Sequence, residues 1–358
     1  MNFIYFVKLT FKAVKQIDLY DFIIALLYCN LNIYGILTST DKQRRDSMEL
    51  NYIKGFTFAP FANRGMLSKK DAYKSLDLMV EKTGANMVIF APSGIQDTAQ
   101  SEKIRYDTEL TMGDGELIDI IRYAKRQGLM VGLKPTANCK DGTWRAHINF
   151  FDKEIHGEPT WRAWFESYTE FQLHYAEIAM AERCDLFICG CEMVMAERRE
   201  EEWRRLIKCI RKIYDGMLTY NADKYQEDNV TWWDALDAIS TSAYYPLGSW
   251  ETEMSRIEDL VEKYQKPFII AEAGCMSRTS ASSMPNNSEI RTPVNIREQS
   301  RWYESMFTCI SRKPWVKGLV IWNWSYMLYS PKKAEADCGY DIYSKPTEDI
   351  VREYFRKL

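Results

Sequence analysis

Two glutamates, each at the end of an apolar stretch, are the residues most suited to chemistry. Glu192 lies in DLFICGCEMV (residues 185–194), directly after its apolar part, and Glu272 lies in PFIIAEAG. Both runs are nearly continuous in apolar residues, which is typical of strands buried on both faces of a parallel sheet. One such glutamate could equally be a solvated boundary or the partner of a nearby Lys or Arg. Two of them indicate cleavage of a glycosidic bond, which needs a proton donor and a second carboxylate.

The separation of the two glutamates favours a (β/α)8 barrel. Residues 192 and 272 are 80 positions apart, which leaves room for three βα units of about 27 residues each, a normal size in such barrels. The carboxylates then fall on the fourth and seventh strands. Because the C-terminal ends of all eight strands converge on one face, where active sites of this fold lie, we predict that the two side chains meet there.

From residue 52 onward, strand-like and helix-like segments alternate, as βα units require. Ser68 and Gly84 are expected to bound the first helix as N-cap and C-cap. An insertion, 136–159, follows the third strand. The sequence predicts one (β/α)8 barrel domain over 48–358, with strands at 52–61, 85–92, 129–135, 185–194, 216–221, 238–247, 267–274 and 317–326.

Composition excludes several other classes of protein. A formal net charge of -3 gives no basic footprint, so we expect no nucleic-acid partner. The nine Cys and three His show no paired zinc spacing, and we find no glycine-rich dinucleotide fingerprint, so we expect neither metal nor cofactor. Cys189 and Cys191 are predicted to be buried thiols of a reducing compartment. The many aromatic residues either fill the core or line a groove for a sugar.

Residues 1–47 do not follow the barrel pattern. Their apolar run, 22–37, has 16 residues, whereas a membrane span needs about 20, and no clear cleavage site follows it. Met48 then opens MELNYIKGFTF, which looks like a natural start. We favour a dispensable N-terminal extension with a misassigned start over the alternative, a weak membrane anchor, and expect a cytoplasmic protein.

The motifs of the barrel, taken in order, resemble glycoside hydrolase family 113, the β-mannanase-like enzymes of the retaining (β/α)8 clan. They are KGFTFAPFANRG, GANMVIFAPSG, FICGCEM, SAYYP, IIAEAG, VIWNW and GYDIYSKP, and the match extends from Tyr52 to Phe355. Spacing alone leaves the roles of the two glutamates open. The resemblance implies that Glu192 is the acid/base, Glu272 the nucleophile, and β-mannan or mannooligosaccharides the substrate.

The resemblance also implies roles for aromatic residues. Tyr244 or Tyr245 would orient the nucleophile, and a donor of this kind would help to hold it ionised. Trp322 or Trp324 would form the floor of the central sugar site. The two tryptophans are two positions apart on one predicted strand, so both can face the barrel mouth, with a core position as the alternative for each, and we predict that at least one stacks on the sugar ring.

One position departs from the clan. An Asn often precedes the acid/base and binds the sugar 2-hydroxyl, whereas this chain has Cys191, whose thiol is a weak donor. Asn221 and Asn138 are the candidates to replace it. Because mannose differs from glucose at that hydroxyl, the reaction type is better defined than the sugar.

Three further residues are candidates for substrate contacts. Trp144 lies in the insertion after the third strand. Lys134 ends the third strand and Arg64 follows the first, and for both of them a structural ion pair is the alternative.

Two other functions stay open. Another β-glycanase of the clan, a galactanase or a glucanase, would share the reaction and differ in its substrate. A carbohydrate-binding barrel that has lost catalysis would bind sugar without cleaving it, but both carboxylates are present here.

Overall fold

A computed structural model describes residues 52–358 of the chain. The expectations for residues 1–47, a dispensable extension or a weak anchor, concern residues outside this range. No helix within 52–358 combines the length and the apolar character that crossing a membrane requires.

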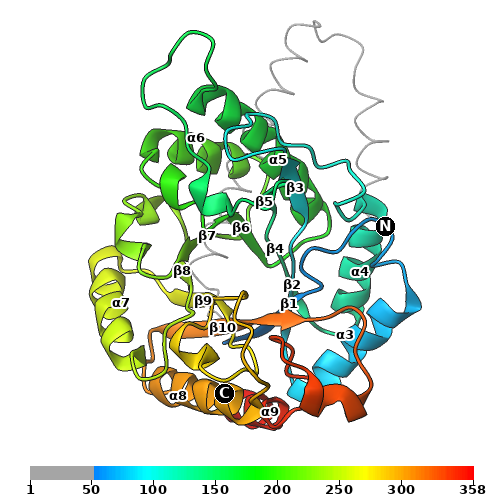
Figure 1. Cartoon of the computed structure of the whole chain (residues 1–358). Coiled ribbons are helices and arrows are strands. Elements are labelled where there is room, and N and C mark those ends of the chain that lie inside the picture. Colours follow the sequence, from blue (N-terminus) through cyan, green and yellow to red (C-terminus); the bar gives the residue numbers. More distant parts are fainter. Residues whose placement is uncertain (1–51) are drawn as a thin grey trace, which may run out of the picture. The chain divides into compact units, whose positions relative to one another are not determined.

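Eight parallel strands close into a barrel in the order β1, β10, β9, β8, β7, β6, β4, β2 (Figure 1). Each strand overlaps one of the eight predicted segments, so the (β/α)8 barrel is confirmed. The strands are β1 (Ile53–Phe58), β2 (Met87–Phe90), β4 (Met130–Leu133), β6 (Leu186–Cys191), β7 (Met217–Asp223), β8 (Ile239–Ser242), β9 (Phe268–Ala273) and β10 (Val316–Trp324).

Helices surround the ring of strands (Figure 1). The α-helices are α3 (Lys70–Thr83), α4 (Asp114–Arg126), α5 (Trp161–Ala181), α6 (Glu200–Ile210), α7 (Trp250–Tyr264), α8 (Ile296–Ile310) and α9 (Pro346–Lys357). Short 3-10 helices lie in the connections: η1 (Arg145–His147), η2 (Val194–Ala196), η3 (Glu227–Asn229), η4 (Trp233–Ala235), η5 (Ala281–Ser283) and η6 (Pro331–Ala336). Gly84 ends α3 in the left-handed conformation, as predicted, but Ser68 does not cap it, because Lys69 is the N-cap residue.

A second, two-stranded sheet was not predicted. It pairs β3 (Ser93–Gln96) with β5 (Thr136–Cys139) in parallel. Each strand follows a barrel strand after two residues, β3 after β2 and β5 after β4. Both strands are short and lack apolar alternation, so no pattern in their residues indicates a strand. Because β5 is the first part of the insertion 136–159, its pairing with β3 sets the direction in which the insertion leaves the barrel strand β4.

The aromatic residues of α5 are buried in the core and do not line a groove for a sugar. Trp164 stacks on Tyr168 with ring centroids 4.7 Å apart. The Trp164 indole N–H donates to Gln96 on β3 (3.0 Å), and the Tyr168 hydroxyl donates to the backbone carbonyl of Cys189 on β6 (3.0 Å). The helix therefore fixes the small sheet and β6 in relation to each other.

Candidate active site

Both glutamates lie at the C-terminal ends of barrel strands. Glu272 is the fifth residue of β9 and Glu192 directly follows β6. They are 4% and 8% exposed, respectively. Glu192 has a positive φ of 53°, a conformation that residues other than glycine adopt rarely and that occurs often at functional sites. Its backbone N–H donates to the carbonyl of Asn221 (2.8 Å), which holds it against β7.

Four donors surround the carboxylate of Glu272. The Lys134 ammonium binds Oε1, and the Tyr244 hydroxyl donates to Oε2 (3.0 Å). The Cys191 thiol and the Asn221 amide donate to Oε1 over 3.5 and 3.4 Å. Burial, and after it the charge of Glu272, raise the pKa of Tyr244 well above its usual value, so its hydroxyl remains a donor. The arrangement suits an ionised carboxylate with a fixed orientation.

Glu192 has two donors, and both contact the same oxygen. The Arg145 guanidinium donates to Oε2 (2.9 Å) and the Trp144 indole N–H donates to the same atom (3.2 Å). Arg145 is held in turn by the Asn138 side-chain oxygen (2.8 Å) and the carbonyl of Ala137 (3.1 Å). No side chain within 52–358 donates to Oε1 of Glu192, which leaves that oxygen for a ligand or a proton.

A pocket opens beside Glu272 on the side of β1, β2, β4 and β10. Trp322 is half-buried in its wall, with the Lys134 ammonium 5.4 Å from its ring centroid and the Phe61 ring edge-on at 5.8 Å. Asn138 and Cys191 line it as well. Its border combines an aromatic face, the Asn138 amide and a carboxylate, which are groups that suit contact with a sugar.

Sequence comparison identifies the family. The model of glycoside hydrolase family 113 matches residues 56–345, most of the chain and the whole of the barrel's active face. The chain belongs to glycoside hydrolase family 113. The predicted resemblance is therefore confirmed, and the protein is a glycoside hydrolase with the barrel fold of its family.

Solved structures agree with this assignment. A family 113 β-1,4-mannanase is 47% identical, with a TM-score of 0.85 over 86% of this chain and 100% of that one. The family 113 β-mannanase of Alicyclobacillus acidocaldarius, in complex with ManMIm, is 37% identical, with a TM-score of 0.84 over 86% and 98%. The Faecalibacterium prausnitzii β-glucuronidase (14% identity, TM-score 0.57, 86% and 49%) shares the fold alone. No curated protein sequence matched.

Three of the predicted site residues neither line this pocket nor contact either glutamate in the family 113 barrel: Trp324, Tyr245 and Arg64. Trp324 is 0% exposed, and its indole N–H donates to the carbonyl of Ser75 (3.0 Å) on α3. The pairing of β1 with β10 shifts register between Trp322 and Trp324. This bulge at Asn323 turns the two tryptophans to opposite faces of the strand, so the core alternative holds for Trp324 and Trp322 alone borders the pocket.

Tyr245 and Arg64 take structural roles. The Tyr245 hydroxyl donates to Glu227 (2.5 Å), away from Glu272, because neighbouring residues of a strand end point to opposite sides. Arg64 pairs with Asp107 (2.5 Å), an exposed aspartate in the connection between β3 and α4, so the ion-pair alternative holds for it. Lys134 also forms an ion pair, but its partner is Glu272 itself.

Arg145 is the site residue that sequence reasoning missed. It follows Trp144, which was a candidate, but nothing in its own spacing marks it. Its place depends on the β3–β5 sheet, which the sequence did not predict. Among residues 52–358 no cluster of His, Cys, Asp and Glu could hold a metal ion.

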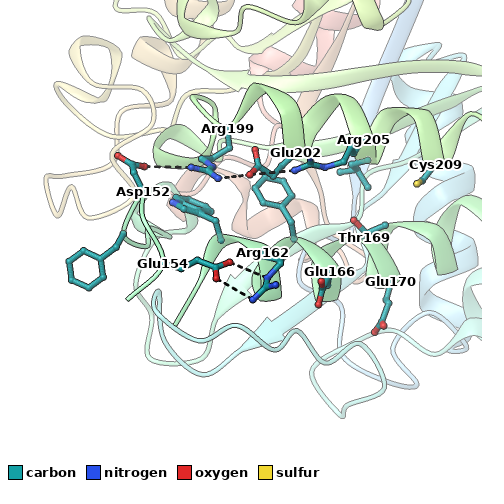
Figure 2. Close-up of a pocket in the computed structure, with 14 residues that line it drawn as sticks. Asp152, Glu154, Arg162, Glu166, Thr169, Glu170, Arg199, Glu202, Arg205 and Cys209 are labelled. Atoms are coloured by element: carbon teal, nitrogen blue, oxygen red, sulfur yellow. Dashed lines mark hydrogen bonds and ion pairs between the residues drawn. The ribbon is translucent and has the colours of Figure 1, made fainter. Parts of the chain in front are cut away.

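A larger groove, of about 740 Å³, lies between α5 and α6 on the outer layer. Figure 2 shows its charged side chains turned toward one another: Arg199 lies between Asp152 and Glu202, and Arg162 meets Glu154. These charges neutralise each other in exposed ion pairs. The groove lies on the outer helices and not at the C-terminal ends of the barrel strands, where active sites of this fold lie, so the barrel mouth is the candidate active site.

Proposed function

We propose that the protein is a retaining β-mannanase that cleaves β-1,4-mannosidic bonds of mannan or mannooligosaccharides. Residues 48–358 would form its catalytic domain, with Glu192 as the acid/base and Glu272 as the nucleophile. Two solved family 113 mannanases at 47% and 37% identity support the substrate class. The positions of the two glutamates on the fourth and seventh barrel strands support the mechanism.

The observation that carries the role assignment is the contrast between the two carboxylates. Both oxygens of Glu272 accept hydrogen bonds, and Lys134 neutralises its charge. Such a carboxylate is held ionised and cannot easily give a proton. Glu192 has its contacts on Oε2 alone, so Oε1 can carry the proton that the leaving oxygen requires.

The proposed reaction has two steps. Glu272 attacks the anomeric carbon while Glu192 protonates the leaving oxygen, which gives a covalent glycosyl-enzyme. Glu192, now ionised, takes a proton from a water molecule that attacks the same carbon and releases Glu272. Two inversions give net retention of configuration.

Neighbouring residues would position the sugar. The exposed face of Trp322 would stack on the ring of the sugar bound beside Glu272. Asn138 lines the pocket, whereas Asn221 is fully buried and its amide is directed to Cys191 and Glu272. We therefore assign the 2-hydroxyl contact to Asn138. Trp144, which is 41% exposed above Glu192, would border the leaving group.

Product analysis tests the proposal. The protein should release reducing ends from β-1,4-mannan and mannooligosaccharides and far fewer from galactan or glucan, and proton NMR at early times should show the β-anomer first. The Glu272→Gln variant is the matched control and should release none. Preference for galactan or glucan would identify another β-glycanase, and binding of mannooligosaccharides without cleavage would identify a carbohydrate-binding barrel.

A further inference from the structure

Two consecutive residues of β7 hold the backbone on both sides of the Glu192 side chain. The Glu192 N–H donates to the carbonyl of Asn221 (2.8 Å), and the next N–H, that of Met193, donates to the hydroxyl oxygen of Tyr220 (2.9 Å). Because the positive φ of Glu192 ends the extended strand, the Met193 N–H lies beyond the pairing of β6 with β7. A buried N–H needs an acceptor, and here a side chain supplies it.

Tyr220 reaches this N–H from the outer side of the barrel wall. Its ring packs against Trp203 of α6, with ring centroids 5.1 Å apart, and against Trp232, at 4.9 Å. Gly190 of β6 leaves the space for this ring, since a Cβ there would lie 2.8 Å from it. Tyr220 is fully buried, so its hydroxyl has a fixed place next to the backbone that follows Glu192.

Glu197 fixes the direction of the Tyr220 hydroxyl. The hydroxyl donates to Glu197 Oε1 (2.8 Å), which leaves its oxygen free to accept from Met193. The Glu197 N–H donates in turn to the carbonyl of Met193 (3.1 Å), so the hydrogen bonds form a closed ring. Glu197 is 1% exposed, and burial raises its pKa to about 8, although the bond from Tyr220 lowers it. The carboxyl is therefore mostly protonated at neutral pH.

The end of the same segment is bonded to the layer of helices. The Trp203 indole N–H donates to the carbonyl of Ala196 (2.9 Å), and the Trp232 indole N–H donates to the carbonyl of Glu197 (3.2 Å). The chain from Glu192 to Glu197 is thus held at each end. None of these bonds involves the Glu192 carboxyl, so they control the direction in which that side chain leaves the backbone and not its charge.

We infer that Tyr220 and Glu197 are positioning residues for the acid/base: through the Met193 N–H they hold the peptide after Glu192 in the conformation that aims its carboxyl at the leaving oxygen. The inference rests on the proposed role of Glu192. Both residues are buried outside the barrel wall and touch no substrate. Their effect on the rate is expected to be large nevertheless, because a displacement of about 1 Å can lower the rate of a reaction step about 100-fold.

The test is the dependence of kcat/KM on the leaving group, measured for Tyr220→Phe with aryl β-mannosides of graded leaving-group basicity. The help of the acid grows with the basicity of the leaving group. With a mannooligosaccharide or phenyl β-mannoside, kcat/KM should fall about 10- to 100-fold. With a dinitrophenyl β-mannoside, whose leaving group needs no proton, the loss should stay below about twofold. An equal loss on all substrates, or no loss on any, would overturn the inference.

Two variants of Glu197 test the second half of the ring. Glu197→Gln keeps an acceptor oxygen for the Tyr220 hydroxyl and has nearly the shape of the protonated carboxyl. It should keep the leaving-group dependence of the unmodified protein. Glu197→Leu removes the acceptor and should show the same selective loss on poor leaving groups as Tyr220→Phe. A leaving-group dependence in Glu197→Leu equal to that of the unmodified protein would overturn the inference for Glu197.

Tyr214→Phe is the matched control. It also removes the hydrogen bond of a buried tyrosine, whose hydroxyl donates to the carbonyl of Cys184 (2.8 Å) before the first residue of β6, at the opposite end of the strand from Glu192. This variant should lower the melting temperature and leave the leaving-group dependence unchanged. The same selective loss in Tyr214→Phe would overturn the inference, since any buried hydrogen bond of the barrel wall would then have the effect.

Folding and the proposed function are checked separately. Tyr220→Phe leaves the buried Met193 N–H without its acceptor, so its melting temperature should fall. Rates are compared at a temperature at which circular dichroism shows each variant folded, and Glu197→Leu gives the same test should Tyr220→Phe not fold. If the unmodified protein cleaves neither mannooligosaccharides nor aryl β-mannosides, the proposed function and the inference both fail. Cleavage with an equal loss on every leaving group overturns the inference alone.

Discussion

Glu272 and Glu192 lie at the same face of one barrel, but different parts of the chain hold them. The four donors to Glu272 come from four barrel strands or the residues directly after them: Lys134, Cys191, Asn221 and Tyr244. The two donors to Glu192, Trp144 and Arg145, come from the part of the insertion 136–159 that follows β5. The closed barrel thus fixes Glu272, the proposed nucleophile, whereas a segment outside the barrel sets the charge next to Glu192, the proposed acid/base.

Lys134 should show the largest effect, because within 52–358 it is the only side-chain cation paired with the buried Glu272. Lys134→Met leaves the Glu272 carboxylate without its counter-charge, which destabilises a buried site by about 3 to 5 kcal/mol. At neutral pH kcat/KM should fall about 100-fold or more. Because loss of a cation favours the protonated carboxyl, the acidic limb of the pH profile should move to higher pH.

Arg145→Met is the matched change at the other carboxylate. The same reasoning applied to Glu192 predicts that the alkaline limb moves to higher pH, with a smaller loss of kcat/KM at neutral pH. The two profiles, measured on one mannooligosaccharide, should therefore shift at opposite limbs. A shift of the same limb in both variants would show that the two carboxylates are not controlled separately.

The two tryptophans of β10 allow a comparison of the barrel mouth, where Trp322 lies, with the barrel wall, where Trp324 is buried. Trp324→Ala removes a fully buried ring and should lower the free energy of unfolding by about 3 to 5 kcal/mol. Trp322→Ala should leave the melting temperature nearly unchanged. It should lower kcat/KM by the equivalent of about 2 kcal/mol in transition-state free energy, because the stacking contact with the sugar is lost. Thermal melts and kinetics on both proteins decide this. Normal turnover by Trp322→Ala would place the sugar platform elsewhere.

Tyr244 and Tyr245 give the comparison with the smallest expected effects. They are neighbours in the sequence, but their side chains point to opposite sides, one to Glu272 and the other to Glu227. Tyr244→Phe removes a hydrogen bond to the Glu272 carboxylate, so kcat/KM should fall by the equivalent of about 1.5 to 3 kcal/mol. Tyr245→Phe removes a hydrogen bond to Glu227, so its cost should appear in unfolding free energy and not in kinetics. Chemical denaturation and steady-state rates separate the two. Equal kinetic losses would contradict the separation of their roles.

The barrel and the positions of both glutamates at strand ends could be predicted from the sequence, because they depend on local patterns of residues. Runs of apolar residues such as those before Glu192 and around Glu272 indicate buried strands, and eight of them alternate with helical patterns. The details of the site depend on geometry that one sequence does not encode locally. A bulge at Asn323 separates Trp322 from Trp324, and the direction of Tyr244 against Tyr245 follows from the register of β8. Arg145 reaches Glu192 only because the short sheet of β3 and β5 redirects the insertion.

The stereochemistry of azide rescue tests the two roles most directly. With Glu192→Ala and an activated aryl β-mannoside, the glycosyl-enzyme should form without acid help and accumulate, and azide should attack it from the face that water uses, giving the β-mannosyl azide. With Glu272→Ala, azide must displace the leaving group from the opposite face and give the α-azide. An α-azide from the Glu192 variant together with a β-azide from the Glu272 variant would reverse the assignment, and full activity in either variant would contradict the carboxylate pair altogether.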